Sequence, residues 1–378
     1  MGASEASTTE TVLALDGVRK LFGASPAVDG ATLTIERGEL FTLLGPSGCG
    51  KTTTLRLVAG LERPDAGEIT LRGRLVASAP RRLCVAPHKR NLGMVAQSYA
   101  IWPHMTVFDT VAYPLQLRGV RRSVIREKVG RVLDLVGLGG LETRPATLLS
   151  GGQMQRLALC RALVYEPDLL LLDEPFSNLD ARLREQMRLE VKLLQRRLGI
   201  TVLFVTHDQV EALSLSDRIA VMHQGRLEQV GPPRRLYESP ASAFVRDFLG
   251  QTVILRGRVE PVPGAPGRVH VALNGALAGH TLAGCPAPSA TFVPGADAHV
   301  AIRPEDIGVS PETPDRPRGN GLVGVIDALL FVGDRYEARV TLGGRDSILL
   351  LLPRAREWRE GQRVHLELPP DMVSVWPV

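Results

Sequence analysis

Residues 45–52 constrain the fold of this chain more than any other segment. They read Gly-Pro-Ser-Gly-Cys-Gly-Lys-Thr and match the pattern G-x-x-x-x-G-K-[ST] in full. The apolar run 41–44 precedes them, and a helical pattern through Thr53, Leu55 and Leu57 follows. A glycine-rich turn between a strand and a helix lets backbone N–H groups converge on a phosphate, and the helix N-terminus adds its positive dipole end. The segment therefore predicts a P-loop for a bound nucleotide.

The side chains of this loop have separate expected tasks. Lys51 is expected to reach the β- and γ-phosphates of a nucleoside triphosphate, and the Thr52 hydroxyl is expected to bind Mg²⁺. Only 5 of the 45 basic residues are lysine, and Lys51 stands where a compact ammonium charge suits a phosphate. The residues predicted to bind the nucleotide are Gly45, Pro46, Ser47, Gly48, Cys49, Gly50, Lys51, Thr52 and Thr53.

A second apolar run, residues 169–172, leads directly into two acids, Asp173 and Glu174. Ligands of α/β proteins bind at the carboxyl ends of the strands, so we expect these carboxylates beside the P-loop. Successive side chains of a strand diverge, which allows the two acids different tasks. Asp173 is expected to hold the Mg²⁺ shell, and Glu174 is expected to polarise the attacking water as general base.

The pattern up to about residue 250 predicts an α/β unit with a mostly parallel sheet. Three continuous apolar runs are typical of strands buried on both faces: 41–44, 169–172 and 202–205. Residues 180–198 carry an apolar stripe at helical spacing, with Asp180 as the predicted cap and Gly199 as the predicted end. Residues 123–136 are predicted to form another helix.

The chain changes character near residue 250, because 14 of its 27 prolines follow that point. Short β-rich runs separated by Pro/Gly turns predict a small all-β barrel or sandwich. The predicted strands cover residues 253–259, 268–273, 299–302, 338–342 and 363–368. The stretches 261–267 and 311–321 are predicted to be loops or linkers.

Composition excludes several classes of protein. Hydrophobic residues make up 44% and charged residues 22%, which is typical of a globular chain and not of a disordered one. The net charge of +5 reflects dispersed arginine, so we expect no nucleic acid partner. The apolar runs are far shorter than the roughly 18 residues of a membrane-spanning helix, and the N-terminus does not have the pattern of a signal peptide. The four cysteines are widely spaced and are predicted to be free thiols.

A third motif, residues 149–153, lies between the P-loop and the acidic pair and reads Leu-Ser-Gly-Gly-Gln. It resembles the signature of the ATP-binding cassette (ABC) ATPases, although Ser-Gly-Gly would also suit a serine-capped helix start. The order of the three motifs identifies the chain as a member of this family. The resemblance implies a homodimer around two ATP molecules, each held by the P-loop of one copy and the signature of the other. The signature residues implied to contact ATP are Ser150, Gly151, Gly152 and Gln153.

Further family markers follow in the expected order. Gln97 resembles the Q-loop glutamine, which would sense Mg²⁺ and water and link the site to a membrane partner. Asp180 ends a run that resembles the D-loop and is implied to contact the nucleotide. His207 resembles the switch histidine that contacts the γ-phosphate. Phe22 resembles the aromatic residue that stacks on adenine, with a core phenylalanine as the alternative. The resemblance therefore implies catalytic roles for Glu174, His207, Gln97 and Lys51, and Mg²⁺ contacts from Thr52, Asp173 and Gln97.

The resemblance covers about residues 12–376 and is greatest for the ATPase subunits of bacterial importers. Four segments match that group, the last of them in its C-terminal TOBE-type β domain: 221–226, 231–233, 237–240 and 301–305. Residues 97–111 and 331–334 favour the ferric iron, phosphonate and polyamine branch. Met154 and Val210 depart from the usual family residues, and neither touches the expected chemistry.

This assignment implies partners and a location. The implied partners are two integral membrane permease subunits and, indirectly, a periplasmic or extracellular substrate-binding protein, with the chain at the cytoplasmic face of the plasma membrane. An importer of sugars or another small solute is an alternative, as are a soluble ABC ATPase of DNA repair or translation and a scaffold that uses nucleotide as a switch.

The predicted domain map has four parts. An N-terminal tail covers residues 1–11, and a nucleotide-binding domain with the RecA-like P-loop NTPase fold covers 12–240, with a helical subdomain at about 98–155. A linker covers 241–252, and a β-rich TOBE or OB-like regulatory domain covers 253–378.

Overall fold

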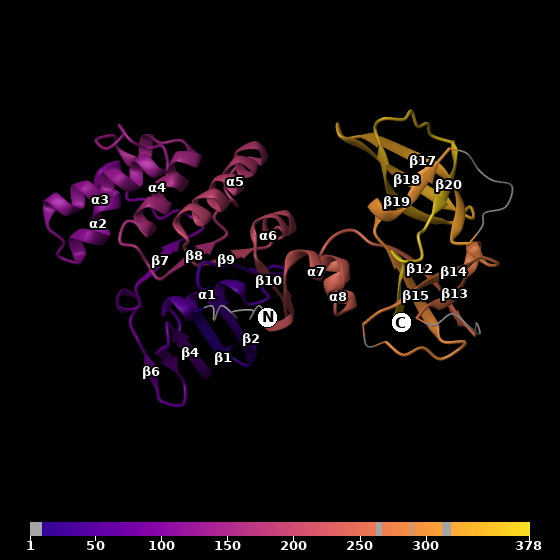
Figure 1. Cartoon of the computed structure of the whole chain (residues 1–378), viewed down its shortest axis with the longest axis horizontal. Coiled ribbons are helices and arrows are strands. Elements are labelled where there is room, and N and C mark those ends of the chain that lie inside the picture. Colours follow the sequence, from indigo (N-terminus) through magenta and orange to yellow (C-terminus); the bar gives the residue numbers. More distant parts are fainter. Residues whose placement is uncertain (1–9, 262–266, 289, 312–318) are drawn as a thin grey trace, which may run out of the picture. The chain divides into compact units, whose positions relative to one another are not determined.

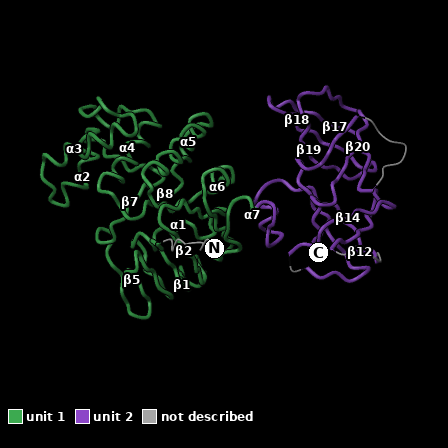
Figure 2. The backbone as a smooth tube through the Cα atoms, viewed as in Figure 1, with its two compact units in different colours: residues 1–236 green, residues 237–378 purple. Residues whose placement is uncertain are grey.

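A computed structural model describes residues 10–261, 267–288, 290–311 and 319–378 of the chain. They form two compact units, divided between Leu236 and Tyr237 (Figure 2). The division falls four residues before the domain end predicted at residue 240. Most of the two predicted loops, 261–267 and 311–321, lies outside the described residues.

The stretch 241–252, predicted as a linker, contains the short helix α8 (Ala243–Phe248). The Ser242 hydroxyl caps this helix by accepting a hydrogen bond of 3.3 Å from the Val245 N–H. A serine cap followed by an apolar turn therefore gives this stretch regular structure. It belongs to the second unit.

A six-stranded sheet forms the centre of the first unit. Its order is β11-β10-β3-β9-β8-β7, and all neighbours are parallel except the pair β10 and β11. The strands are β3 (Leu40–Leu44), β7 (Leu92–Val95), β8 (Leu169–Asp173), β9 (Val202–Thr206), β10 (Arg218–His223) and β11 (Arg226–Gly231). The three predicted apolar runs are confirmed as β3, β8 and β9, each to within one residue.

Side chains of the central strands alternate between two cores. On β8, Leu170 and Leu172 belong to the core beneath the larger helices, whereas Leu169 and Leu171 belong to the core on the opposite face. All four leucines are at most 4% exposed. A strand buried on both faces needs apolar residues at every position, which explains the continuous leucine run.

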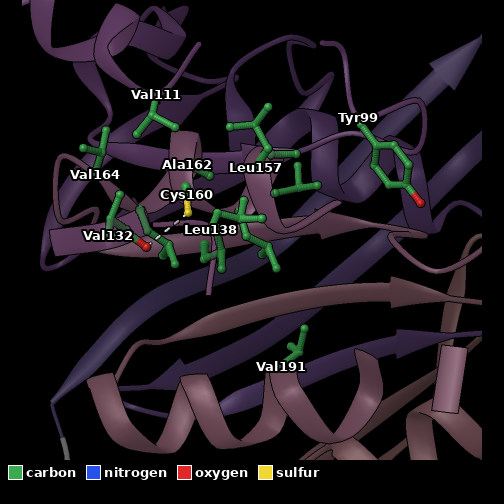
Figure 3. Packing of buried hydrophobic residues seen from close by; sticks show 14 of the residues in the cluster. Tyr99, Val111, Val132, Leu138, Leu157, Cys160, Ala162, Val164 and Val191 are labelled. Carbon is green, nitrogen blue, oxygen red and sulfur yellow. Dashed lines mark hydrogen bonds between the residues drawn. The ribbon is translucent and has the colours of Figure 1, made fainter. Parts of the chain in front are cut away.

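In the described part of the chain, four helices build the layer on one face of this sheet (Figure 1). They are α2 (Val107–Leu117), α3 (Arg122–Leu135), α4 (Gly151–Leu163) and α5 (Ala181–Leu198). Helix α4 contacts β7, and α2 and α3 pack against α4. Figure 3 shows Val132, Leu157 and Cys160 in their shared core, where the Cys160 thiol donates to the Val132 carbonyl at 3.3 Å. The predicted ends of α5 are confirmed, because Asp180 caps its start and Gly199 adopts a left-handed conformation at its end. Among the described residues, no helix has the length and apolar character needed to cross a membrane.

An antiparallel sheet and α1 (Lys51–Ala59) share the core on the other face. Its order is β2-β1-β4-β5-β6. Its strands are β1 (Thr11–Phe22), β2 (Ser25–Glu36), β4 (Ala66–Leu71), β5 (Arg74–Ser78) and β6 (Leu83–Cys84). The remaining helices of this unit are short: α6 (Gln209–Leu215) and α7 (Pro233–Glu238), the latter crossing the unit division.

The second unit is a β structure in two parts. A closed barrel joins β12 (Val253–Glu260), β13 (Val269–Leu273), β14 (Thr281–Pro286), β21 (Ser374–Pro377) and β15 (Asp297–Ile302). A separate sheet joins β16 (Gly308–Ser310), β20 (Arg363–Glu367), β17 (Gly321–Phe331), β18 (Arg335–Leu342) and β19 (Asp346–Pro353). The predicted β-rich domain is confirmed, and it holds an open sheet beside the barrel around one shared core.

Candidate functional site

Three loops meet at one edge of the central sheet because the strands that lead into them are parallel neighbours. β3, β9 and β8 lie side by side in that order. The P-loop follows β3, His207 follows β9, and Glu174 follows β8. The carboxyl ends of parallel strands form the ligand-binding edge of α/β sheets. The sheet topology therefore brings together residues that are far apart in the sequence.

Two glycines shape the P-loop by allowing backbone to approach backbone. A Cβ atom on Gly50 would lie 2.1 Å from the carbonyl oxygen of Ala27, and Gly50 has a φ of 108°. A Cβ atom on Gly45 would lie 2.3 Å from the carbonyl oxygen of Met222. Both distances are far below van der Waals contact. The loop can therefore close over a phosphate only with glycine at these two positions.

The Lys51 ammonium lies inside the loop. Its Nζ donates to the carbonyl oxygens of Gly45 at 2.8 Å and Pro46 at 2.9 Å, and the residue is 5% exposed. The thiol of Cys49 lies 3.7 Å from the same Nζ. Burial raises the pKa of that thiol above its usual value, although the Lys51 charge opposes the shift. Cys49 is therefore a protonated thiol that lines the loop, and Lys51 supplies the positive charge inside it.

Thr52 and Asp173 are the two residues placed to hold a hard cation. The Thr52 hydroxyl donates to Oδ1 of Asp173 at 3.1 Å. Burial raises the pKa of Asp173; the Thr52 hydroxyl lowers it, and the neighbouring Glu174 charge raises it further. A hydroxyl and a carboxylate oxygen are the ligands that Mg²⁺ takes beside nucleotide phosphates, with water completing its shell. The donor set therefore fits Mg²⁺.

Glu174 and His207 form the acid–imidazole pair of the site. Nδ1 of His207 lies 3.1 Å from Oε1 of Glu174, with the histidine side chain 55% exposed and the glutamate side chain 20% exposed. Glu174 has a φ of 45°, which is uncommon for a residue with a Cβ atom. Its N–H donates to the carbonyl of Val205 at 2.9 Å. This bond ties the end of β8 to β9, so the carboxylate faces the loop that carries His207.

A buried glutamate that the sequence did not single out fixes the loop around His207. The Thr206 hydroxyl donates to Oε2 of Glu211 at 2.5 Å and accepts from the Asp208 N–H at 3.0 Å. Glu211 is 4% exposed, and burial raises its pKa. The residues on both sides of His207 are thus held, while its ring stays accessible. The sequence signal that could have identified Glu211 is a glutamate on the inner face of the short helix α6.

Gln97 follows β7, the outer neighbour of β8. Its backbone carbonyl accepts a hydrogen bond of 2.9 Å from the Asn178 side chain, and both residues are exposed. Asn178 belongs to the predicted D-loop but was not predicted to contact Gln97. The loops that carry these two residues are therefore joined directly.

The other predicted site residues make local contacts. Ser150 and Gln153 form a capping box at the start of α4, with the Ser150 N–H donating to Oε1 of Gln153 at 3.0 Å. Asp180 accepts from the Leu183 N–H at 2.9 Å as the cap of α5. The Phe22 ring is 54% exposed, with the Lys20 ammonium 5.4 Å from its centroid. The alternative of a core phenylalanine is thereby ruled out, and the exposed ring leaves a face for stacking.

A P-loop lysine, a threonine–aspartate pair and a glutamate–histidine pair at one sheet edge define a P-loop nucleoside triphosphatase. The signature residues 150–153 form the capped start of α4, which lies in the separate helical layer. This feature is typical of the ATP-binding cassette class. Comparison with known proteins agrees. Residues 28–177 match the ABC transporter family, and residues 300–376 match the TOBE domain.

Curated relatives extend over most of the chain. It is 47% identical over 322 residues to an Fe(3+) ions import ATP-binding protein, FbpC 1, of Rhizobium meliloti, which covers 85% of both chains. It is 45% identical over 351 residues to a spermidine/putrescine import ATP-binding protein, PotA, of Pseudomonas aeruginosa, which covers 93% of both. The chain belongs to the ABC transporter family and is an ATP-hydrolysing subunit of an ABC importer.

A solved structure shows the same cassette fold. The cbiO1 protein of Clostridium perfringens, described as part of the ABC transporter complex cbiONQ, superposes with a TM-score of 0.55 at 27% identity. The match covers 60% of this chain and 90% of cbiO1. The predicted fold class, an ABC cassette followed by an all-β TOBE domain, is therefore confirmed.

Proposed function

We propose that this chain hydrolyses ATP with Glu174 as the base that activates water and with Mg²⁺ held by Thr52 and Asp173. One observation carries the proposal: the 3.1 Å contact of Glu174 with His207 lies at the same strand ends as the 3.1 Å contact of Thr52 with Asp173. A carboxylate positioned beside a phosphate site can take a proton from water. Bound Mg²⁺ supplies positive charge that neutralises the phosphate oxygens.

The remaining residues of the chain position ATP. The backbone N–H groups of residues 45–52 cradle its phosphates, and Lys51 turns its ammonium from the Gly45 and Pro46 carbonyls toward the γ-phosphate. His207 contacts the γ-phosphate and holds the Glu174 carboxylate in place. Gln97 senses the water and Mg²⁺ of the site, and the exposed ring of Phe22 stacks on adenine.

Two copies act together in this proposal. Ser150, Gly151, Gly152 and Gln153 begin a helix, whose N-terminal N–H groups favour an anion. The P-loop is on a different layer of the same chain, so the signature serves ATP held by a second copy. Asp180 and its loop lie on the dimer side of the site. A homodimer with two ATP molecules is therefore the hydrolysing unit.

The dimer drives import at the cytoplasmic face of the plasma membrane. Its partners are integral membrane permease subunits, and a substrate-binding protein delivers cargo to them from outside. The names of the relatives give two cargoes, Fe(3+) ions and spermidine/putrescine. We assign this chain to a system that carries ferric iron or a polyamine.

Uptake measurements test this function. A strain that lacks the gene is complemented with the wild-type chain or with Glu174→Gln, and uptake of radiolabelled ferric iron and of radiolabelled spermidine is measured. Wild type should restore uptake of one of the two, and Glu174→Gln should restore neither. Restored uptake with Glu174→Gln would refute the role of this residue. If the wild-type chain restores uptake of a sugar and of neither labelled cargo, the cargo assignment alone is refuted.

A further inference from the structure

The Arg161 side chain forms hydrogen bonds with the backbone that follows Gln97. It lies near the end of α4, and its guanidinium donates to the carbonyl of Tyr99 at 2.7 Å and to the carbonyl of Ala100. The same guanidinium lies 5.2 Å from the centroid of the Trp102 ring. One side chain thus contacts three residues within a four-residue stretch. Arg161 lies outside every motif that the sequence presents.

The two residues that Arg161 contacts through their carbonyls have an unusual backbone conformation. Tyr99 has a φ of 60° and Ala100 a φ of 47°. Left-handed conformations are disfavoured for residues with a Cβ atom, and two in succession are rarer still. Such a turn persists only where its surroundings hold it. The two hydrogen bonds from Arg161 hold these same residues, together with the 2.9 Å bond from the Tyr99 N–H to the Ala96 carbonyl.

A second contact holds the other end of this loop. The Asn178 side chain donates to the Gln97 carbonyl at 2.9 Å. The loop is therefore fixed by Asn178 at Gln97 and by Arg161 two and three residues later. Trp102, two residues after Ala100, packs against Tyr113 of α2 with ring centroids 4.9 Å apart.

The helix that carries Arg161 also carries the signature. Ser150 caps α4, and Arg161 lies ten residues after Gly151, which is about 15 Å along a helix axis. Helices move as rigid bodies, so a displacement of the signature end is transmitted to Arg161. We infer that Arg161 is a positioning residue that sets the conformation of residues 97–102 and couples the signature helix to Gln97. This inference rests on the role proposed above for Gln97.

A double-mutant cycle on the full-length chain tests it. ATP hydrolysis is measured as kcat and KM at saturating Mg²⁺ for Arg161→Ala, Gln97→Ala and the double variant. Arg161→Ala should lower kcat about tenfold and change KM by less than about twofold, because the P-loop is untouched. The double variant should be no slower than Gln97→Ala, since Arg161 acts through Gln97. Additive losses would overturn the inference, because they describe a purely structural arginine.

A matched control removes a similar contact elsewhere. The guanidinium of Arg118, just after α2, lies 3.6 Å from the ring centroid of Tyr165, just after α4, and Arg118→Ala should keep kcat within about twofold of wild type. An equal loss of kcat in Arg118→Ala would overturn the inference. If Arg161→Ala does not fold, Arg161→Lys replaces it in the cycle, because lysine keeps the charge but not the planar fork.

The two proposals fail in different ways. Normal kcat in Gln97→Ala refutes the role of Gln97 and, with it, coupling through Arg161. A slow Gln97→Ala together with normal kcat in Arg161→Ala and Arg161→Lys overturns only the inference about Arg161.

Discussion

Nδ1 of His207 lies 3.1 Å from Oε1 of Glu174, although 33 positions separate the two residues in the sequence. The contact exists because β8 and β9 are adjacent parallel strands whose carboxyl ends lie together. The Glu174 N–H bonds to Val205 of β9 and fixes the carboxylate beside the histidine. The pair is thus a property of the sheet topology, and its chemistry can be tested by single substitutions.

Glu174→Gln should bind ATP and dimerise but lose turnover. The amide keeps the size of the side chain and can still accept a hydrogen bond from His207, but it cannot take a proton from water. Loss of a general base costs about 10²–10⁴-fold in rate. Phosphate release measures turnover, and size-exclusion chromatography with ATP measures dimerisation. A variant that hydrolyses ATP at the wild-type rate would show that Glu174 is not the base.

Asp173→Asn should stabilise the protein free of nucleotide and metal at neutral pH. Burial raises the pKa of Asp173 in the folded state, so ionisation of this carboxyl costs stability. The stability that the neutral carboxyl contributes is present below the unfolded pKa of about 3.9 and is lost as pH rises through the folded pKa. Asparagine avoids the loss and can still accept the Thr52 hydrogen bond.

The expected gain at pH 7 is small, on the order of 1–2 °C in Tm. It should shrink as pH falls toward 4, and Mg²⁺-dependent hydrolysis should be lost at every pH. Thermal unfolding between pH 4 and pH 7 gives the comparison. A lower Tm than wild type at pH 7 would contradict the stated cause of the pKa shift.

The sequence predicted the part of the fold in which local chemistry and topology agree. A P-loop requires a strand before it and a helix after it, and β3 and α1 supply them. The leucine run before Asp173 must be buried on both faces, so its alternation between two cores followed from its composition. In contrast, β1 carries several register shifts against β2. Its apolar residues lose the simple alternation of a strand, and the sequence did not predict this sheet.

Contacts through long side chains could not be read from the sequence. The bonds from Arg161 to Tyr99 and Ala100 span about 60 positions. The bond from Thr206 to Glu211 depends on a helix that folds back over its own strand. In the second unit, β15 pairs with β21, more than 70 positions later. Periodicity alone therefore gave barrel or sandwich as alternatives, and the unit contains a barrel beside an open sheet.

Lys51→Ala should lower the affinity for ATP at least about tenfold, because a charged hydrogen bond contributes about 1.5–3 kcal/mol. It should also lower Tm, since the Gly45 and Pro46 carbonyls lose their donor. Lys128→Ala is the control: Lys128 pairs with Glu166 at 2.9 Å, and the glutamate side chain is 75% exposed. Such a pair contributes at most about 1 kcal/mol. Titration with a fluorescent ATP analogue compares the two, and equal affinities would argue against the P-loop assignment.

Gly50→Ala and Gly48→Ala separate steric overlap from backbone strain in the P-loop. Both glycines have positive φ, 108° and 81°, but only Gly50 faces a close neighbour, the Ala27 carbonyl. A Cβ atom on Gly48 meets nothing within 4 Å. Gly48→Ala should therefore cost about 1–2 kcal/mol of unfolding free energy, which is the strain of one left-handed residue.

Gly50→Ala should cost more than about 3 kcal/mol, because the loop or the strand that carries Ala27 must move. That movement takes the N–H groups of the loop away from the phosphates, so ATP binding should fall with stability in this variant. Gly48→Ala retains the loop shape and should keep more of its ATP affinity. Chemical denaturation gives the two free energies. Equal costs for the two variants would mean that the approach of Gly50 to Ala27 does not determine the shape of the loop.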